Sequence, residues 1–414
     1  MVDSDVLVVG GGPAGSSVAF ALATRGVSVH IIDRAHFPRP KPCAEYLSPE
    51  ASRIMAAMGA LERVEATGAA ALAGVRVRAP NGRVIAGDFV AAHGFRGFRD
   101  RGLSVRREVL DAILLDAARA AGARVTEGVR VTDLVRRGET IAGVSVLTPD
   151  GAREIRARLV IGADGLRSVV ARRLGVARTL RWPRRLALVT HYANVDGVGE
   201  HGEMHVERDG YVGIADVGNG LTTVALVVPA RRSREIAGDR AAFLDAWLRA
   251  RPHLAPRFAA ATRASPVVAT GPFASHARRA WAPGVALVGD AADFFDPFTG
   301  EGIYAALRGG ELLAPWASEA VVARTDGDAR RALAAYDAER RREFGGKWIV
   351  ERVIGAVVGA APLINRAARG LSVRKDLADV LIGVTGNFIP PREVIRVGYL
   401  WGVFGWTPGH RAGG

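Results

Sequence analysis

The stretch that decides the fold is Asp-Val-Leu-Val-Val-Gly-Gly-Gly-Pro-Ala-Gly at residues 5–15. Its first half is an apolar run, which predicts a short strand buried on both faces, as in a parallel sheet. Its second half, residues 10–15, has the spacing Gly-x-Gly-x-x-Gly. A helical pattern follows from about residue 14 to Arg25 and ends at Gly26, because glycine commonly terminates helices.

Each glycine of this turn has a physical task. Gly10 permits the tight turn, Gly12 lets a pyrophosphate approach the backbone, and Gly15 lets the helix lie close to the strand. The uncovered N–H groups at the start of the helix, around Pro13 and Ala14, are suited to bind phosphate oxygens. The turn therefore favours a ligand that carries a pyrophosphate.

The residues after the helix strengthen this interpretation. A second strand is predicted at residues 27–32, and Asp33 follows it directly. An acid about 20 residues beyond the glycines can accept hydrogen bonds from a ribose. The complete strand–turn–helix–strand pattern predicts a dinucleotide-binding domain.

Two later motifs repeat the same arrangement of an apolar strand followed by glycine and aspartate. Residues 159–168 read Leu-Val-Ile-Gly-Ala-Asp-Gly-Leu-Arg-Ser, and residues 285–303 run from Val-Ala-Leu-Val-Gly-Asp to Pro-Phe-Thr-Gly-Glu-Gly-Ile. Each motif places an acid at the carboxyl end of a predicted strand, where ligands of open α/β sheets bind. We expect all three turns to meet at one ligand.

With three motifs in this order and spacing, residues 3–340 resemble flavoproteins with the fold of para-hydroxybenzoate hydroxylase. This superfamily includes group A flavin monooxygenases, flavin-dependent halogenases and geranylgeranyl reductases. The resemblance implies an α/β fold with a discontinuous Rossmann-like FAD-binding domain, an inserted antiparallel β-sheet substrate domain and a C-terminal helical cap. It also implies that the cofactor is FAD.

The resemblance also assigns cofactor contacts. Asp33 would hold the adenosine ribose, Arg107 would approach the pyrophosphate and Val129 would lie near the adenine. Asp164 belongs to a signature that the superfamily links to both FAD and NAD(P)H sites, and Asp290 would bind the ribitol chain. The full expected set of FAD contacts is Gly10, Gly12, Pro13, Ala14, Gly15, Asp33, Arg34, Lys41, Arg107, Val129, Asp164, Gly289, Asp290, Pro297, Gly300, Gly302 and Ile303.

The segment 297–303 also makes sense without the resemblance. Thr299 is a predicted N-cap, and the glycines after it leave several N–H groups uncovered at a helix start. Directed at the flavin ring, they would stabilise its anionic reduced form by up to about 2 kcal/mol. Glu301 fits a simpler role as a favourable acid in the first turn of the helix.

We predict three parts of the chain. The FAD-binding domain would take residues 1–80, 100–180 and 275–340. The substrate domain would take residues 81–99 and 181–274, and the cap residues 341–414. Residues 186–228 predict a four-stranded meander, with hairpin turns at Asp209-Gly210 and Asn219-Gly220, which would cover the flavin ring.

Composition narrows the choice of partners. The net charge is +14, but only three of the 56 basic residues are lysine, so a GC-rich genome and an anionic partner explain the charge equally well. Arginines spread along the whole chain do not indicate a nucleic-acid surface.

The single cysteine, Cys43, fits a reducing cytoplasm. No signal peptide or span of about 18 uncharged residues is visible, so we expect a cytoplasmic protein.

The last 70 residues alternate apolar segments with single arginines. They either pack as a helical cap on the FAD domain or form the mouth of an apolar pocket. In the second case, residues 350–410 would make peripheral contact with a membrane, because aromatic and basic side chains suit its interface.

Three flavin chemistries compete. Hydroxylation needs a dry apolar pocket, halogenation diverts the flavin hydroperoxide, and reduction passes a hydride to a carbon–carbon double bond. Residues 41–44, Lys-Pro-Cys-Ala, resemble the Lys-x-Cys-Gly of geranylgeranyl reductases with the glycine lost. The Trp-x-Trp-x-Ile-Pro motif of halogenases is absent, and of the reductases' aromatic sheet motif only Tyr211 remains.

Our first expectation is an NAD(P)H-dependent monooxygenase acting on a hydrophobic, polyketide- or isoprenoid-like molecule. A reductase of carbon–carbon double bonds is the alternative; a halogenase or a non-catalytic flavin-binding scaffold ranks lower. Candidate catalytic residues are Cys43, Tyr211 and His191. His201 and His205 do not form a metal site, because no third ligand is evident. No second glycine motif for NAD(P)H is found, so the donor binds transiently or a partner reductase supplies electrons.

Overall fold

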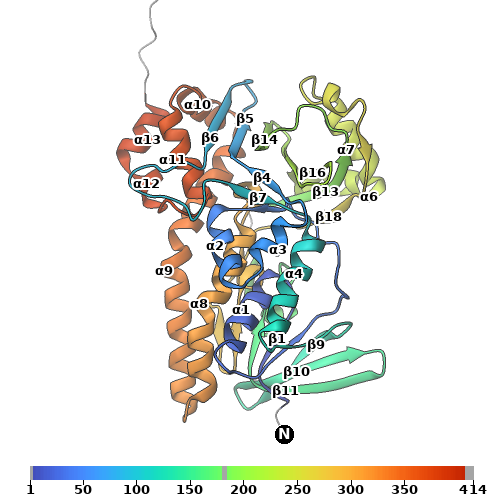
Figure 1. Cartoon of the computed structure of the whole chain (residues 1–414), viewed down its shortest axis with the longest axis vertical. Helices are drawn as coiled ribbons and strands as arrows, with labels where there is room; N and C mark the ends of the chain where they lie inside the picture. Colours follow the sequence, from blue (N-terminus) through green and yellow to red (C-terminus); the bar gives the residue numbers. More distant parts are fainter. Residues whose placement is uncertain (1–2, 180–183, 406–414) are drawn as a thin grey trace, which may run out of the picture.

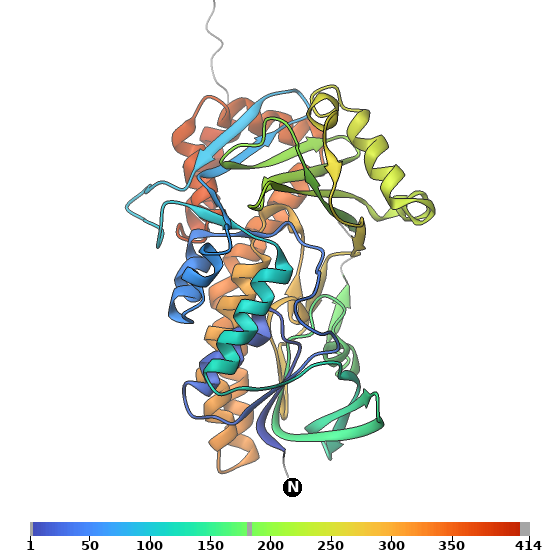
Figure 2. The ribbon, with the colours of Figure 1, turned by 45° about the vertical axis from the view of Figure 1, so that its right-hand side comes forward.

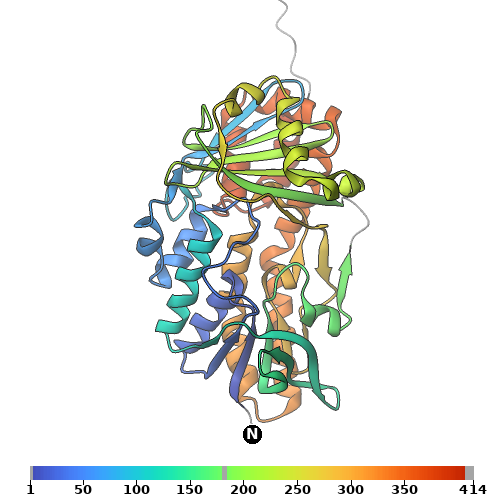
Figure 3. The same ribbon diagram turned by 90° about the vertical axis from the view of Figure 1, so that its right-hand side faces the viewer.

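A computed structural model of the protein describes residues 3–179 and 184–405. One large sheet lies in the lower half of the molecule as drawn in Figure 1, and a second lies in the upper half. The long helix α9 (Asp326–Val358) runs along both halves and leads into the C-terminal helices. The turned views in Figures 2 and 3 show the same stacking of the two halves.

The lower sheet is the expected Rossmann-like sheet. Its strand order is β20-β21-β11-β1-β2-β8, and the pairs from β21 to β8 are parallel. β1 is almost entirely buried because its residues are apolar on both faces. The bounds are β1 Ser4–Val9, β2 Val29–Ile32, β8 Arg124–Thr126, β9 Arg130–Arg137, β10 Thr140–Thr148, β11 Gly151–Gly162, β20 Trp281–Ala282 and β21 Val285–Leu287, with β9 and β10 continuing from β11 as an antiparallel ribbon.

Two helices start at the carboxyl end of this sheet and pack closely. They are α1 (Pro13–Ala23) and α8 (Gly302–Val322). A Cβ atom at Gly310 of α8 would lie 2.6 Å from the backbone nitrogen of Val18 in α1, so only glycine allows this approach. The Ser17 hydroxyl donates to the Leu307 carbonyl at 2.7 Å. These contacts hold the two helix N-termini at the same end of the sheet.

The upper sheet is antiparallel apart from the β14–β5 pair, with strand order β17-β13-β16-β15-β14-β5-β6 and β18 beside β13. One face packs on α6 and α7 around Leu188, Val212 and Trp247, and the other faces the lower half of the molecule. The bounds are β5 Gly74–Arg78, β6 Val84–Asp88, β13 Arg185–Ala193, β14 His201–Glu207, β15 Gly210–Asp216, β16 Leu221–Pro229, β17 Thr262–Arg263 and β18 Val268–Thr270.

Two expectations about this sheet need correction. The four central strands do not form a simple meander, because β13 pairs with β16 rather than with β14. Both predicted hairpin turns do occur, between β14 and β15 and between β15 and β16. The expected boundary at residue 80 divides one sheet, since β5 pairs with β14 across it. The sequence of the short strand β5 contains no signal for its pairing with β14, which lies more than 120 residues further along the chain.

Shorter elements connect the two sheets. Two three-stranded sheets have the orders β12-β19-β22 and β3-β7-β4. Their bounds are β3 Tyr46–Leu47, β4 Ala70–Leu72, β7 Gly102–Ser104, β12 Ala177–Thr179, β19 Ser275–Ala277 and β22 Asp293–Phe294. The remaining helices of this part are α2 Pro49–Ala57, α3 Leu61–Glu65, α4 Arg107–Ala120, α5 Val169–Arg173, α6 Ser233–Gly238 and α7 Arg240–Arg249, with 3-10 turns η1 Ala230–Arg232, η2 Ala255–Phe258, η3 Gly289–Ala291 and η4 Pro297–Thr299.

The C-terminal helical cap is present, and it packs against the upper sheet. α11 lies against β6, where a Cβ at Gly87 would be 2.5 Å from the Ile382 side chain. No single helix among the described residues has the length and apolarity to cross a membrane, although α9 and α10, bent by 108°, meet that criterion as a pair. The bounds are α10 Ala361–Leu371, α11 Lys375–Thr385, α12 Arg392–Ile395 and α13 Val397–Phe404.

Candidate flavin and substrate site

A cavity of about 1250 Å³ lies between the carboxyl ends of the lower strands and the inner face of the upper sheet. The cap helices α9 to α13 close its remaining side. This is the place where open α/β sheets bind ligands. The cavity has a polar part built from the three sequence motifs and an apolar part built from the upper sheet and the cap.

The first motif has the geometry of a phosphate-binding turn. Gly10 has φ +106°, and a Cβ there would lie 2.5 Å from the Ala163 carbonyl oxygen; a Cβ at Gly15 would lie 1.8 Å from the Gly10 oxygen. Gly12 is the N-cap of α1, and no side chain caps the helix. The first N–H groups of α1 are therefore free to bind an anion.

Asp33, the expected ribose ligand, lines the cavity and also organises the turn. Its two carboxylate oxygens accept hydrogen bonds from the backbone nitrogens of Gly11 and Ala35, each at 2.8 Å. The Val129 nitrogen donates to the Asp33 carbonyl at 2.8 Å, which brings Val129 to the same end of the cavity. Arg34 also lines this end.

A group of basic side chains follows along the cavity. Arg107 makes a bidentate pair with the buried Asp111, at 2.7 and 2.8 Å, and Arg39 lies 3.3 Å from the same carboxylate. Nη1 of Arg39 is buried without a hydrogen-bond partner among the residues described. Lys41 also lines the cavity, and burial lowers its pKa while Asp290 opposes that shift. Sequence reasoning missed Arg39, because nothing in the local pattern separates it from the other surface arginines.

The acids of the second and third motifs lie at the same cavity. Oδ2 of Asp164 accepts hydrogen bonds from the backbone nitrogens of Val169 and Val170, while its Oδ1 is buried with no partner in the described parts of the chain. Asp290 belongs to η3, and burial raises its pKa, against the effect of Lys41 and Arg107. Both carboxyl groups keep capacity to bind a polar ligand.

The third motif ends in the open N-terminus of α8. Gly300 has φ +71°, and a Cβ there would lie 2.7 Å from Cδ1 of Tyr46. The prediction that Thr299 is the N-cap of α8 is wrong. Glu301 occupies the N-cap position, and its side chain makes no capping hydrogen bond. The chain passes through η4 first, and the buried hydroxyl of Thr299 has no hydrogen-bond partner within the described structure.

All expected FAD contacts line the cavity except Gly15 and Gly289. These two glycines act in packing. Gly15 lets α1 approach the turn, and a Cβ at Gly289 would lie 2.8 Å from the Cβ of Ala14. Pro297, Gly302 and Ile303 line the cavity as expected.

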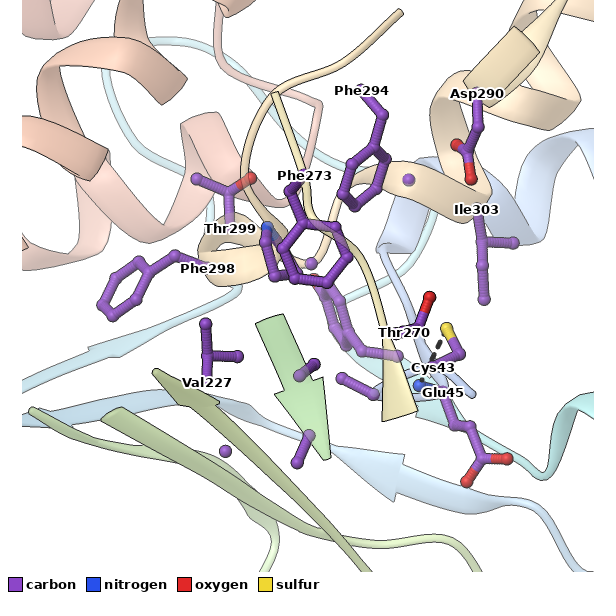
Figure 4. A pocket seen from close by; sticks show the side chains of 18 of the residues that line it. Cys43, Glu45, Val227, Thr270, Phe273, Asp290, Phe294, Phe298, Thr299 and Ile303 are labelled. Carbon is purple, nitrogen blue, oxygen red and sulfur yellow. Dashed lines mark hydrogen bonds between the residues drawn. The ribbon is translucent and has the colours of Figure 1, made fainter. Parts of the chain in front are cut away.

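Cys43 lies where the polar and apolar parts meet. Figure 4 shows it on the same side of the view as Ile303 and Asp290, with Phe298 and Val227 on the other side. Its Sγ accepts a hydrogen bond from the Glu45 nitrogen at 3.3 Å, and burial raises the pKa of the thiol. Cys43 is therefore a protonated thiol at neutral pH.

His191 does not line the cavity, contrary to its expected catalytic position. Its Nε2 lies 2.7 Å from Oε2 of Glu45, and its Nδ1 lies 3.0 Å from the Ser265 hydroxyl. Glu45 has φ +64°, a strained value for glutamate, and its Oε1 accepts from the Arg107 nitrogen at 2.9 Å. His191 thus holds the loop that carries Cys43 and acts as a positioning residue.

Tyr211 does line the cavity, but its hydroxyl is already engaged. It donates to Oδ1 of Asp296 at 2.8 Å, and Arg185 pairs with the other carboxylate oxygen. Burial, with Asp296 close by, raises the pKa of Tyr211 well above its usual value. The ring meets Phe298 edge-on at 5.0 Å and forms part of the wall.

The remainder of the cavity is apolar. The upper sheet supplies residues such as Val75, Val189 and Val227, and the rings of Phe273 and Phe294, tilted by 51°, have centroids 5.3 Å apart. The cap continues this wall from α9 to α13 with Val350, Val353, Val357, Ile364, Leu371, Leu381, Val394, Leu400 and Phe404. Such a wall suits an extended hydrocarbon ligand.

Comparison with known proteins indicates which cofactor the polar part of the cavity fits. The sequence profile of the FAD binding domain family matches residues 3–347. The chain belongs to this family. This flavoprotein is an FAD-dependent oxidoreductase, and the three motifs with their unpaired polar atoms fit FAD.

Sequence relatives of this flavoprotein include lipid reductases. It is 29% identical over 405 residues to digeranylgeranylglycerophospholipid reductase 2 of Methanopyrus kandleri, which covers 96% of this chain and 95% of the relative. It is 31% identical over 358 residues to digeranylgeranylglycerophospholipid reductase of Methanothrix thermoacetophila, covering 84% and 85%.

Solved structures confirm the fold of this flavoprotein. The myxobacterial chondrochloren halogenase CndH has a TM-score of 0.79 at 24% identity and covers 98% of both chains. PqsL of P. aeruginosa, solved with 2-aminobenzoylacetate, has a TM-score of 0.69 at 25% identity and covers 91% of this chain and 99% of its own. The CndH halogenase and PqsL therefore share the architecture found here.

Proposed function

We propose that this flavoprotein reduces carbon–carbon double bonds in a long hydrophobic substrate of the isoprenoid-lipid class. The observation that carries the proposal is the continuous cavity, in which the open N-terminus of α8 and Cys43 lie at the entrance to an apolar branch lined by the cap. The relatives named as digeranylgeranylglycerophospholipid reductases support it. They do not support the preference for hydroxylation that the motifs suggested.

FAD, when bound, supplies two-electron redox chemistry. The protein's own residues would bind the cofactor, stabilise charge at its ring and exclude water. The turn at residues 10–15 and the basic residues Arg39 and Lys41 would bind the pyrophosphate. The N–H groups at the start of α8 favour negative charge at the ring. Phe273, Phe294 and the valines of β13 and β16 exclude water from the reacting bond.

Hydroxylation remains a second candidate because of one specific observation, the structural likeness to PqsL at 25% identity. PqsL is described as a probable FAD-dependent monooxygenase. The same dry cavity would serve an oxygen-using reaction. The two candidates differ in what they consume, so oxygen uptake separates them.

The deciding experiment uses the FAD-loaded protein, reduced under nitrogen and mixed with a polyprenyl substrate such as a geranylgeranylated glycerol lipid. We expect the flavin to reoxidise without oxygen and the product to be heavier by two hydrogen atoms per double bond. A product that forms only in air and carries one added oxygen atom would refute the proposal in favour of hydroxylation.

We propose NAD(P)H as the electron donor, with a separate reductase protein as the alternative source. The test is anaerobic bleaching of the bound flavin by NADH or NADPH, with dithionite as the positive control. Bleaching by dithionite alone would reject direct reduction and point to the partner protein.

We further propose that the substrate enters from an anionic membrane surface through the cap. The exposed large apolar residues of α12 and α13 are Ile395, Val397, Leu400 and Trp401; Val397 is 82% and Trp401 73% exposed. Ile395 and Leu400 also line the cavity, so this patch is continuous with its apolar branch. Exposed aromatic and apolar residues beside arginines suit a headgroup region.

Vesicle binding tests this entry route. We expect the protein to sediment with phosphatidylglycerol vesicles and less with phosphatidylcholine vesicles, and the double variant Val397→Ser, Trp401→Ser to lose that binding. The control is Val322→Ser, which removes an exposed valine (73%) at the far end of α8. Unchanged sedimentation of the double variant would reject the cap as the docking surface.

A further inference from the structure

One row of residues runs straight across the inner face of the upper sheet. The strands follow in the order β13, β16, β15, β14, β5 and β6, and one residue of each strand is paired with one residue of the next. The six residues, which we call the cross-strand row, are Val189, Ala225, Gly213, Met204, Val77 and Ile85.

Every residue of the cross-strand row lines the cavity. Its side chains pack in the same apolar cluster as the cap residues Val350 and Ile364. The residues next to the row along two of the strands, Leu188 and Val212, belong to the cluster with α7 on the other face of the sheet. The row is therefore one apolar wall of the cavity, and the cap forms the wall opposite.

The cavity is longer across the strands than along them. Five strand spacings separate Val189 from Ile85, which is about 24 Å at the usual spacing between neighbouring strands. Along one strand, at most three inward-facing residues line the cavity among those described, such as Tyr211, Gly213 and Ala215 of β15, and they span about 13 Å. A long chain therefore fits with its axis across the strands.

The two ends of the cross-strand row lie in different parts of the site. At the β13 end, His191 lies 2.7 Å from Glu45 of the loop that carries Cys43. At the β6 end, a Cβ at Gly87 would lie 2.5 Å from the Ile382 side chain of α11, and Figure 1 shows the cap helices on this side of the sheet. The row thus runs from the cofactor end of the cavity to the cap.

The parallel rows on either side are interrupted. On one side the Tyr211 ring meets Phe298, and Val206, which pairs with Tyr211 from β14, does not line the cavity. On the other side the row ends at Gly87, because Ile382 lies against its backbone. The cross-strand row is therefore the path that stays open over all six strands.

Gly213 lies in the middle of this path and has no side chain to obstruct it. A Cβ there would lie 3.2 Å from Sδ of Met204, and the next nearest atoms are backbone oxygens at 4.0 Å. Its φ angle is outside the left-handed region, so the backbone itself does not require glycine. The missing side chain leaves room in the cavity, and the flexible Met204 beside it can adapt to a ligand.

We propose that the cross-strand row is a ruler for the hydrocarbon chain of the substrate, and that Gly213 is the position that lets a long chain pass. The chain would lie across the strands, with its reacting double bond at the β13 end and the remainder directed toward the cap. An extended isoprene unit advances by about one strand spacing, so a chain of four units would reach from Val189 to Val77. The proposal rests on the proposed isoprenoid class of substrate, and not on whether that substrate is reduced or hydroxylated.

Binding profiles test the ruler without any reaction. The FAD-loaded, oxidised protein is titrated by calorimetry with geraniol, farnesol and geranylgeraniol, which contain two, three and four isoprene units. We expect the wild type to bind geranylgeraniol most tightly. Gly213→Val should bind geraniol within about twofold of the wild type and geranylgeraniol about 100-fold more weakly, because the far half of the longer chain loses its burial.

Two further variants complete the test. Gly199→Val is the matched control, because a Cβ at Gly199 meets nothing within 4 Å and the residue does not line the cavity. Val77→Phe places the obstruction two strands nearer the cap, so it should weaken geranylgeraniol binding about 10-fold and leave geraniol and farnesol unchanged. FAD content and melting temperature show that each variant is folded. If Gly213→Val is not folded, Gly213→Ala gives the same comparison with a smaller effect.

The possible failures are distinguishable. In Gly213→Val, an equal loss of affinity for geraniol and geranylgeraniol, or no loss for either, overturns the ruler. The same chain-length limit in Gly213→Val and Val77→Phe also overturns it. If the wild type binds none of the three alcohols, the proposed substrate class is wrong and the ruler falls with it. If the two variants shift the limit as expected, the ruler stands even where the substrate fails to reoxidise the reduced flavin and the proposed reduction is rejected.

Discussion

The buried cluster of Arg185, Asp296 and Tyr211 should be the most sensitive polar contact in the protein. Arg185 pairs with Asp296, and its Nη2 donates to the Gly355 carbonyl of α9 at 2.9 Å, while the Tyr211 hydroxyl donates to Asp296 at 2.8 Å. The Arg185 and Asp296 side chains are 9% and 5% exposed. The cluster therefore joins the upper sheet, the cap and the residue that precedes Pro297.

The protein contains a natural control for this cluster. Arg263, Asp245 and Tyr192 have the same chemistry: Arg263 lies 2.6 Å from Asp245, and the Tyr192 hydroxyl donates to it at 2.8 Å. Here the arginine and aspartate are 28% and 31% exposed. Water can solvate the remaining partner when one member is removed.

The difference in burial between the two clusters sets the expected difference in the free energy of unfolding between the two variants. Arg185→Met leaves the Asp296 carboxylate buried without its cation, which should cost about 3–5 kcal/mol in the free energy of unfolding. Arg263→Met breaks a largely solvated pair and should cost about 0–1 kcal/mol. Methionine keeps most of the aliphatic packing in both variants, so the comparison isolates the charge.

The assay is urea unfolding at neutral pH, followed by tryptophan fluorescence with excess FAD present. Because stabilisation by FAD depends on the affinity of each variant, unfolding is repeated at several FAD concentrations and the contribution of binding is subtracted for each variant. FAD content of the purified Arg185→Met protein should also fall, because the loop that begins at Pro297 loses its anchor. Equal losses of stability in the two variants would refute the argument from burial.

Three further outcomes follow from the site. Gly300→Ala should abolish FAD retention, because a left-handed backbone and a 2.7 Å approach to Tyr46 forbid a side chain, whereas Gly345→Ala, with open space around its Cβ, should leave the yellow colour unchanged. Cys43 should react with iodoacetamide more slowly than a free cysteine peptide at about pH 8.5, because its raised pKa keeps it a thiol there, and the rate should rise at higher pH; a fast reaction at neutral pH would contradict this. Arg39→Met should weaken FAD binding about 10-fold, as read by fluorescence titration, because Arg39 lines the cavity and its Nη1 has no partner in the described structure; unchanged affinity would remove Arg39 from the site.

Local sequence predicted the parts of the site that depend on short-range geometry. The turn at residues 10–15, the strand that precedes it and the acid Asp33 follow from spacing alone, and the structure places them together. The hairpins at Asp209-Gly210 and Asn219-Gly220 also follow, because few residue pairs accept those backbone angles.

Long-range pairing could not be predicted in the same way. Three features depend on which segments pack together across 28 or more residues: the place of β5 beside β14, the pairing of β13 with β16, and the contact of His191 with Glu45. Neither periodicity nor turn chemistry carries that information.

The sequence by itself predicted a dinucleotide site built from three turns, because each turn needs particular residues at particular positions. Only the tertiary structure decided which side chains of the ligand site are buried, which are paired, and where its apolar branch lies. Burial of Glu301 near Lys347, the paired state of Arg107 and Tyr211, and the apolar branch under the cap arise where distant segments exclude water. The electrostatic behaviour of a side chain depends on that exclusion, and a list of residues does not contain it.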